Sequence, residues 1–255
     1  MKGYDRLYIL DMPVDRLTMD KAVSIISERI QAKRKTTVFT PNVDHLVKAQ
    51  FDEEFKEIYS QTDLSLVDGM PLVWTSILYG RRLPQRINGT NLIWELCQLA
   101  QAKGFTLFFL GSSSDIVRLA RQNLQTRFPA VKIAGYYSPP FGTTFDREEI
   151  PRIVEQVNSC KPDILLVAFG PLKQEKWINK YHKILDAYIF IGVGGALDLI
   201  SGRLRRAPKW MQDVGLEWLF RLYQEPRRLM KRYLIGNAIF IYLVCKKALK
   251  IFSLR

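Results

Sequence analysis

The sequence predicts an α/β fold, with a doubly wound, largely parallel sheet and a C-terminal helical appendage. Short apolar runs alternate with helical patterns through residues 1–202, which is typical of βα units. Most of these runs are apolar throughout, as expected for strands that helices cover on both faces. After Gly202 the strand-like runs stop and only helical patterns follow. The core is therefore expected to be Rossmann-like.

The expected strands are short and bounded by turn or helix signals. In chain order they are residues 6–10, 36–40, 64–67, 105–111, 131–137, 163–170 and 188–194.

Several of the intervening helices begin at a residue that can cap them. Hydroxyl and amide side chains at this position accept hydrogen bonds from the free N–H groups of the first turn. The expected pairs are Thr18 before residues 19–30, Asn42 before residues 43–50, and Ser113 or Ser114 before residues 115–128.

The positive charge of the chain is concentrated behind a boundary near residue 202. The formal net charge is +13, and residues 203–255 hold thirteen Lys and Arg but only three acidic residues, a net of +10. Residues 1–202 are thus nearly neutral. We expect an α/β catalytic core over 1–202 and a basic, aromatic helical appendage over 203–255. This asymmetry indicates a polyanionic partner, either nucleic acid, anionic lipid headgroups or a phosphorylated substrate.

The sequence carries no sign of export or of a membrane span. Cys97, Cys160 and Cys245 are widely spaced and indicate neither a disulfide framework nor a zinc site. The N-terminal residues are too polar for a signal peptide. The longest apolar run, residues 238–245, is far shorter than the roughly 20 residues of a spanning helix. A cytoplasmic protein is expected.

Polar residues follow two of the expected strands, where ligands of such sheets bind. Asp68 comes directly after residues 64–67, and its carboxylate could accept a proton from a substrate hydroxyl. It could instead cap the helix that starts near Met70. Thr40 and Asn42 follow another strand beside a helix N-terminus, which attracts phosphate. Asn42 alone also fits a plain N-cap.

Glycine-bearing turns follow other strands and would let a nucleoside or phosphate approach the backbone. Gly111 opens one such turn, and Gly192 and Gly194 lie in another that leads to Asp198. Neither completes the G-x-G-x-x-G fingerprint of dinucleotide sites, and no P-loop is present. Gln174 lies in the first turn of a further expected helix, which opens at Pro171.

Neither histidine nor acidic residues are spaced to hold a metal. The chain has two histidines, His45 and His182, and neither belongs to a recognisable triad or zinc motif. The strand-end loops also lack the paired aspartates of metal-dependent sugar-nucleotide enzymes, so no metal and no cofactor are expected.

The appendage combines cations with aromatic side chains on amphipathic helices. Residues 216–224 place Leu216, Leu219, Phe220 and Tyr223 on one face. Such segments are typical of helices in a membrane interface. Arginine is preferred to lysine where phosphate is bound by paired hydrogen bonds. The arginines here include Arg206, Arg221, Arg228 and Arg232, and Lys231 shares a side with the last two.

Taken together, the motifs resemble the WecG/TagA/CpsF family of bacterial glycosyltransferases (glycosyltransferase family 26). The resemblance covers residues 37–235. Its motifs stand in order as TPNVDHL, TDLSLVDGMPLVW, LPQRINGTNL, FFLGSS, KPDILLVAFGPLKQEKWI, GVGGALDLISGRLRRAPKW and GLEWLFRLYQEPRRLMKRY.

The resemblance implies transfer of a sugar from a UDP-sugar to a polyprenyl-diphosphate-linked sugar. The family acts at the cytoplasmic membrane face, in the synthesis of wall teichoic acid, enterobacterial common antigen or exopolysaccharide. By resemblance, Asp68 is the general base. Substrate contacts fall on Thr40, Asn42, Arg86, Gln174, Asp198, Arg221, Arg228 and Lys231. Two positions depart from the family pattern: the motif before Gln174 reads Pro171-Leu172-Lys173, and Lys231 replaces an expected arginine.

The sequence thus predicts an inverting, metal-independent glycosyltransferase, peripheral on the inner face of the cell membrane. Its partners would be a UDP-sugar, a polyprenyl-diphosphate-linked acceptor and an anionic membrane surface, with self-association possible. An alternative is a nucleotide- or nucleic-acid-binding module with a basic tail, although no helix-turn-helix or aromatic sheet platform is present. A third is an oxidoreductase, which the incomplete glycine fingerprint disfavours. The donated sugar, the acceptor and the pathway are left open.

Overall fold

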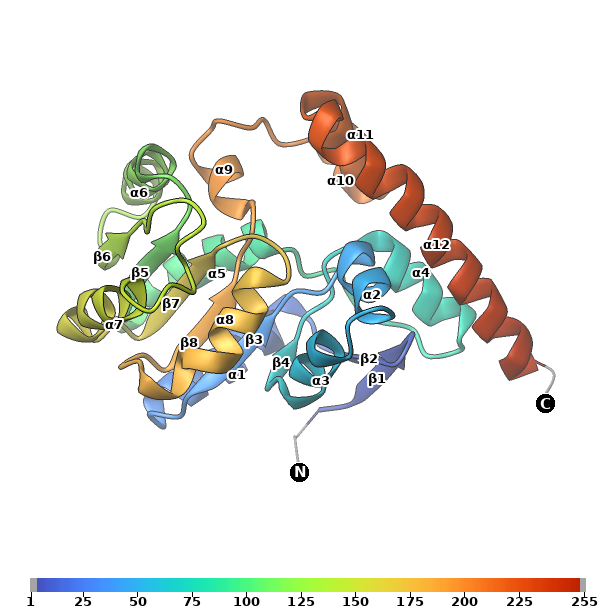
Figure 1. The fold of residues 1–255 in the computed structure, drawn as a ribbon, viewed down its shortest axis with the longest axis horizontal. Coiled ribbons are helices and arrows are strands. Elements are labelled where there is room, and N and C mark those ends of the chain that lie inside the picture. Colours follow the sequence, from blue (N-terminus) through green and yellow to red (C-terminus); the bar gives the residue numbers. More distant parts are fainter. Residues whose placement is uncertain (1–3, 253–255) are drawn as a thin grey trace.

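The computed structural model describes residues 4–252 and is built around a six-stranded, all-parallel sheet (Figure 1). Along the sheet the strand order is β4-β3-β8-β7-β5-β6. The predicted α/β class and the parallel sheet are confirmed. Residues 253–255, the end of the predicted appendage, lie outside the described residues. The strands are β3 (Thr36–Phe39), β4 (Leu64–Ser65), β5 (Thr106–Gly111), β6 (Lys132–Tyr137), β7 (Ile164–Ala168) and β8 (Ile189–Gly192).

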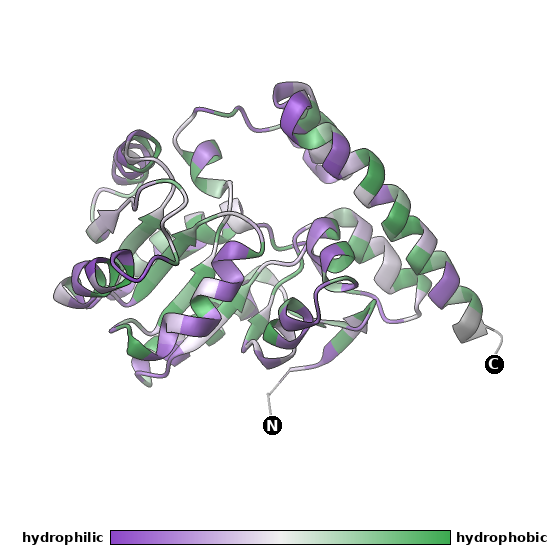
Figure 2. Ribbon diagram, in the orientation of Figure 1, coloured by the Kyte–Doolittle hydropathy of each residue, from purple (hydrophilic) through white to green (hydrophobic). Residues whose placement is uncertain are grey.

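The central strands are buried on both faces, which explains why their sequences are apolar throughout. In β7, Leu166 packs into one hydrophobic cluster while Leu165 and Val167 pack into the other. Successive side chains of a strand point to opposite faces, so the sheet separates two cores. In Figure 2 the strands of the sheet are accordingly coloured as hydrophobic.

Helices form a layer on each face of the sheet. One layer contains α1 (Met19–Gln31), α5 (Gly89–Lys103), α6 (Ser114–Arg127) and α9 (Ala196–Ile200). The other contains α2 (Val43–Ala49), α3 (Glu53–Gln61), α4 (Met70–Leu78), α7 (Glu149–Cys160) and α8 (Lys173–Tyr181), which the short helix η1 (His182–Ile184) extends.

The predicted helix starts are found where expected. The Thr18 side chain accepts from the Lys21 N–H at the start of α1, and Asn42 caps α2 through the N–H groups of Asp44 and His45. Ser113 precedes α6 without a side-chain cap.

The first apolar run forms a hairpin apart from the parallel sheet, contrary to its expected place in the βα alternation. β1 (Arg6–Ile9) pairs antiparallel with β2 (Met12–Asp15). The two residues between them, Leu10 and Asp11, both have positive φ, as a tight hairpin turn requires. Buried Asp15 pairs with Arg6 and accepts the backbone N–H of Ser65 at 2.7 Å, which ties the hairpin to β4.

Beyond Gly202 the chain is helical, with α10 (Lys209–Asp213), α11 (Glu217–Gln224) and α12 (Pro226–Phe252). α12 runs back along the core beside α2 and α4 (Figure 1). Leu229, Phe240 and Val244 are buried on its inner face, and Lys247 pairs with Asp11 of the hairpin turn at 2.6 Å. Among the described residues, no helix is long and apolar enough to cross a membrane.

Candidate active site

A cavity of about 740 Å³ lies at the carboxyl ends of the strands, and α11 and α12 complete its wall. Parallel sheets place loops from neighbouring strands at this edge, so residues far apart in sequence meet there. The appendage therefore contributes to the same cavity as the core. Of the residues predicted from sequence, those that line it are Thr40, Asn42, Asp68, Arg86, Gly111, Gln174, Gly194, Asp198, Arg221 and Arg228.

Asp68 reaches the cavity from the end of β4. Its backbone N–H donates to the Pro41 carbonyl at 2.8 Å, which fixes it beside the loop after β3. The N-cap of α4 is Gly69, with φ of 145° and no side-chain cap. The alternative interpretation of Asp68 as a helix cap is therefore wrong. The carboxylate makes no hydrogen bond or ion pair with any residue between 4 and 252.

The surroundings of Asp68 suit a proton acceptor. The pKa of Asp68 is raised to about 6, and the largest cause is burial. Arg86 and Arg221 act to lower this pKa, and Glu217 acts to raise it. A carboxylate with this pKa is a stronger base than an ordinary one and is still ionised at neutral pH.

Arg86 lies next to Asp68 because the chain between α4 and α5 is bonded to the end of β4. The N–H of Ile87 donates to the Val67 carbonyl at 2.7 Å. At the wall of the cavity, Arg86 Nη2 lies 3.0 Å from Glu217 Oε2 at the start of α11. This ion pair joins the core to the appendage.

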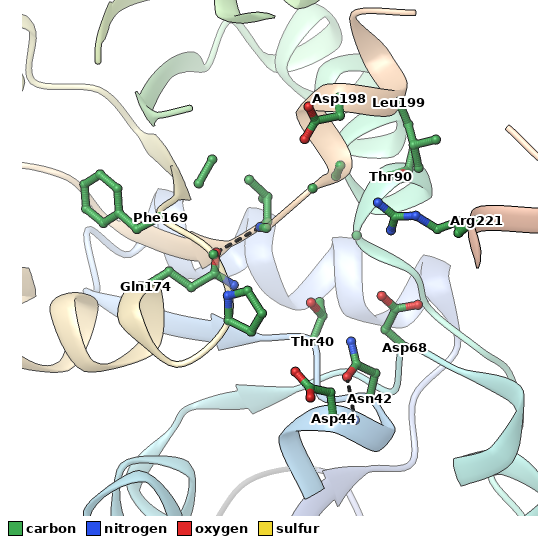
Figure 3. Close-up of a pocket in the computed structure, with 18 of the residues that line it drawn as sticks. Thr40, Asn42, Asp44, Asp68, Thr90, Phe169, Gln174, Asp198, Leu199 and Arg221 are labelled. Atoms are coloured by element: carbon green, nitrogen blue, oxygen red, sulfur yellow. Dashed lines mark hydrogen bonds between the residues drawn. The ribbon is translucent and has the colours of Figure 1, made fainter. Parts of the chain in front are cut away.

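Thr40 and Asn42 occupy the loop between β3 and α2. Thr40 Oγ1 donates to the Gly192 carbonyl at 3.5 Å, so it links the ends of β3 and β8. The oxygen of Asn42 accepts the N–H groups that it caps, and its nitrogen is on the side of the cavity in Figure 3. Asn42 is therefore an N-cap and a cavity residue at once. The ring of His45 lies beneath it, with Nδ1 2.9 Å from Asn42 Oδ1.

Gln174 is held at both ends of its amide. Its Oε1 accepts the Gly194 N–H at 2.9 Å, and its Nε2 donates to Glu175 Oε1 at 2.8 Å. A Cβ on Gly192 would lie 2.8 Å from that nitrogen. Gly192 does not line the cavity. Because it has no side chain, it leaves the space that the Gln174 amide occupies.

The helix that carries Gln174 begins two residues later than expected. α8 starts at Lys173, after Leu172 with φ of 69°. Lys176, a cation near the positive end of this helix, pairs with Asp52, the N-cap residue of α3, at 2.9 Å. The negative charge of Asp52 offsets the unfavourable interaction of Lys176 with the helix dipole.

Glycine is also required at Gly111. Its φ is +97°, and a Cβ there would lie 2.7 Å from the Phe169 ring and 2.8 Å from the Ala168 carbonyl oxygen. The backbone of this turn can therefore face the cavity directly.

Asp198 and the glycine turn before it meet Arg221 of α11. Burial raises the pKa of Asp198, and Arg203 pairs with it at 3.7 Å. A Cβ on Gly195 would lie 3.0 Å from Arg221 Nη2. In Figure 3 the Arg221 guanidinium lies between Asp68 and Asp198.

One guanidinium group around the cavity keeps an unused donor. Arg206, Arg221 and Arg232 each have a buried Nε–H without a hydrogen bond within residues 4–252. Those of Arg206 and Arg232 face a carboxylate in an ion pair, which leaves the Nε–H of Arg221 as the unused one of the three. Arg206 lies behind the lining, 4.0 Å from Glu217 Oε1, and burial lowers its pKa. Arg221 and Arg228 share Glu225 as an ion-pair partner. A buried, unused donor of this kind favours an anionic ligand.

The expected position of Lys231 in the cavity is corrected. Its side chain is exposed and absent from the lining, because it lies on another side of α12. Arg232, one residue on, lines the cavity instead and lies 3.3 Å from Asp44 Oδ2. In the sequence, Arg228 and Arg232 share one side of the helix, and this spacing could have indicated Arg232 as a site residue. Glu217 was not identified as a site residue from sequence.

The described residues contain no group of three or more His, Cys, Asp or Glu side chains that could hold a metal ion. The expectation of a metal-free reaction stays a prediction.

Comparison with known proteins gives a consistent family. The chain matches the "Glycosyl transferase WecG/TagA/CpsF family" over residues 7–253. It is similar to the N-acetylglucosaminyldiphosphoundecaprenol N-acetyl-beta-D-mannosaminyltransferase of Bacillus subtilis (strain 168), with 32% identity over 199 residues, 78% of this chain and 75% of the relative. The protein of that name from Staphylococcus aureus (strain MW2) is 27% identical over 245 residues, 95% of this chain and 93% of the relative.

Proposed function

This chain belongs to the WecG/TagA/CpsF family of glycosyl transferases, and from that premise we propose that it transfers an N-acetylmannosamine-like sugar from a UDP-sugar to a polyprenyl-diphosphate-linked N-acetylglucosamine. The choice of sugars is supported by the names of the Bacillus and Staphylococcus relatives. Family membership decides for a glycosyltransferase over the oxidoreductase and nucleic-acid-binding alternatives.

The observation that carries the proposal is the meeting of one half-buried carboxylate with several arginines in a single cavity. Asp68 comes from the core, and Arg221 and Arg228 come from the appendage. The Nε–H of Arg221, which has no hydrogen-bond partner within residues 4–252, offers a donor that a phosphate oxygen would satisfy. A nucleoside diphosphate leaving group supplies such oxygens.

In the proposed reaction Asp68 accepts the proton of the acceptor hydroxyl. The hydroxyl oxygen forms a bond to the anomeric carbon of the donor as the bond from that carbon to the UDP oxygen breaks. A single displacement of this kind inverts the anomeric configuration. The negative charge that develops on the diphosphate is stabilised by Arg86, Arg221 and Arg228. General base catalysis of this kind contributes on the order of 10²–10⁴-fold.

The donor is proposed to lie along the loops that follow β3, β5, β7 and β8. Thr40, Asn42 and Gln174 provide neutral hydrogen-bonding groups there, and the glycine turns at Gly111 and Gly194 allow close approach of a nucleotide. Arg86, Arg221 and Arg228 would also bind the diphosphate of the lipid-linked acceptor, which would enter the cavity from the side of the appendage.

A lipid-linked acceptor requires contact with a membrane surface, and α12 has a second apolar face suited to it. Met230, Leu234, Ile241 and Leu249 are 50% to 71% exposed, and their spacing places them on one side of the helix. Hydrophobic residues recur along the whole of α12 in Figure 2. With the positive charge of the appendage, this face supports peripheral attachment to an anionic membrane. We place this membrane at the cytoplasmic face, where UDP-sugars would be supplied.

The proposal is tested by the mass of the product lipid. The purified chain is incubated with a panel of UDP-sugars and a synthetic polyprenyl-diphosphate N-acetylglucosamine. The expected product is heavier than the acceptor by one N-acetylhexosamine residue. Asp68→Asn should lower the rate by on the order of 10²–10⁴-fold while UDP still binds. An unaltered lipid with every donor, or an Asp68→Asn variant of normal rate, would overturn the proposal or the role of Asp68 respectively.

A further inference from the structure

Glu217 is an appendage carboxylate that reaches the core beside Asp68. It is the first residue of α11, lines the cavity, and its side chain is 17% exposed. Its Oε2 lies 3.0 Å from Arg86 Nη2, and its Oε1 lies 4.0 Å from Arg206 Nε. The carboxylate thus stands between a core arginine and an appendage arginine, at the point where the two parts of the chain meet.

Arg86 and Glu217 act on Asp68 with opposite sign. Arg86 stabilises the charged form of Asp68, and Glu217 stabilises the protonated form. An Arg86 side chain released from Glu217 would be free to pair with the Asp68 carboxylate. Such a pair would make Asp68 a weaker base.

Five other charged or titratable groups around Asp68 come from four helices and from the segment before α10. They are His45 of α2, Tyr59 of α3, Arg221 of α11, Tyr233 of α12 and Arg206. Among these groups and Arg86, two form ion pairs with Glu217 within 4.0 Å, namely Arg86 and Arg206. Arg206 belongs to the appendage, as Glu217 does. Of the groups named, Arg86 is therefore the one that Glu217 pairs with in the core.

We propose that Glu217 is a positioning residue: it holds the Arg86 guanidinium away from Asp68, so that the base is fully assembled only while α11 lies on the core. The inference rests on the proposed function of Asp68 as general base. It gives the appendage a second task beside phosphate binding. A core without its docked appendage would keep Asp68 but lose the partner that restrains Arg86, and its base would be weaker.

Glutamine at this position tests the proposal, because it keeps the size of the side chain and removes its charge. In Glu217→Gln, the acid limb of kcat/KM against pH should move to lower pH by about half a unit or more, and the plateau should fall. Glu217→Asp keeps the charge and should restore the position of the limb even where it lowers the plateau. Asp213→Asn is the matched control, since Asp213 is exposed and pairs within α10; its profile should equal that of the unmodified chain.

A double-mutant cycle separates positioning from general loosening. If Glu217 acts through Arg86, Glu217→Gln should add little to the loss caused by Arg86→Gln. A limb that stays in place together with additive losses would overturn the proposal. If Glu217→Gln does not fold, Glu217→Ala also removes the charge, and its comparison alone and combined with Arg86→Gln carries the same two outcomes.

A readout without turnover keeps this inference distinct from the proposed function. The carboxyl ¹³C signal of Asp68, assigned by its loss in Asp68→Asn, is titrated in the chain without substrates. Its midpoint should move to lower pH in Glu217→Gln and not in Asp213→Asn. An unmoved midpoint overturns the role of Glu217 whether or not a donor has been found. A midpoint that moves in Glu217→Gln, and moves much less when Arg86 is already changed to Gln, would support the positioning of Arg86. In a chain that transfers no sugar, the same result would contradict the proposed function alone.

Discussion

At the scale of single residues, the raised pKa that suits Asp68 to the proposed role of proton acceptor also lowers the stability of the folded chain at neutral pH. Removal of the Asp68 carboxylate from water opposes ionisation more strongly than Arg86 and Arg221 favour it. Folding raises its pKa from the ordinary 3.8 to about 6, so the folded chain binds this proton more tightly than the unfolded chain. The favourable contribution is therefore complete below about pH 4 and is lost as the pH rises through 6.

This linkage predicts that Asp68→Asn stabilises the chain at neutral pH. Asparagine stays uncharged, so the free energy of unfolding at pH 7.5 should rise by about 1–3 kcal/mol. At pH 4 the gain should almost vanish. Urea unfolding at the two pH values measures it, and Asp186→Asn, at an exposed position, serves as control. A variant no more stable than the parent at pH 7.5 would show that Asp68 is not destabilised by burial.

Sequence reasoning could place Asp68 because its position after an apolar strand points to the ligand edge of the sheet. The same reasoning reached Thr40, Asn42 and Gln174. It could not find Glu217 as the partner of Arg86, because the two residues are 131 positions apart and meet only through the packing of α11. Lys231 was misplaced for a similar reason: the rotation of α12 about its axis is set by the residues that it buries, such as Leu229 and Phe240.

At the scale of elements, the strands could be predicted from their apolar runs, but membership in the sheet could not. β1 has the same composition as a sheet strand, yet the two-residue turn at Leu10 and Asp11 sends the chain straight back into β2. Two residues are too few for a crossover to a parallel neighbour, so the pair forms a hairpin. The turn carries no glycine and gave no strong hairpin signal.

The junction between β8 and α8 leads to a prediction about donor binding. In Gly192→Ala the new Cβ would lie within 3.2 Å of the Gln174 amide, which is 3% exposed and bonded at both ends. Gln174 must then shift and release Gly194. The Kd for UDP, measured by calorimetry, should rise by about five- to tenfold, equivalent to one hydrogen bond.

Gly236→Ala is the matched control for that substitution. Gly236 lies inside α12 with nothing near its added Cβ, so the Kd for UDP should not change and the helix should gain slightly in stability. Equal affinities in both variants would mean that the contact between Gly192 and Gln174 does not shape the nucleotide site.

At the scale of the whole molecule, α12 is apolar on two sides. One side carries Phe240 and Val244 into the core cluster, while Leu234 and Ile241 face outward. The sequence indicated an apolar, basic tail, and only the structure separates the residues that pack from those left exposed. It also shows that the appendage is packed along the core rather than held at a distance.

The exposed side leads to a prediction about the proposed attachment to lipid. Leu234→Asp combined with Ile241→Asp should weaken co-sedimentation with anionic phospholipid vesicles by at least tenfold, since each side chain loses more than about 1 kcal/mol of burial. Ile184→Asp, at an equally exposed position in η1, should bind as the parent does. Equal binding of all three proteins would assign attachment to another surface.

The central claim is that core and appendage form one catalytic cavity, and the transfer rate of appendage variants tests it most directly. Arg221→Ala and Arg228→Ala each remove a guanidinium that lines the cavity, whereas Arg227→Ala removes an exposed neighbour outside it. With one UDP-sugar and one lipid acceptor, the first two should each lose on the order of 10²-fold in kcat/KM, and Arg227→Ala should stay within about twofold of the parent. Full activity in both Arg221→Ala and Arg228→Ala would contradict a shared cavity.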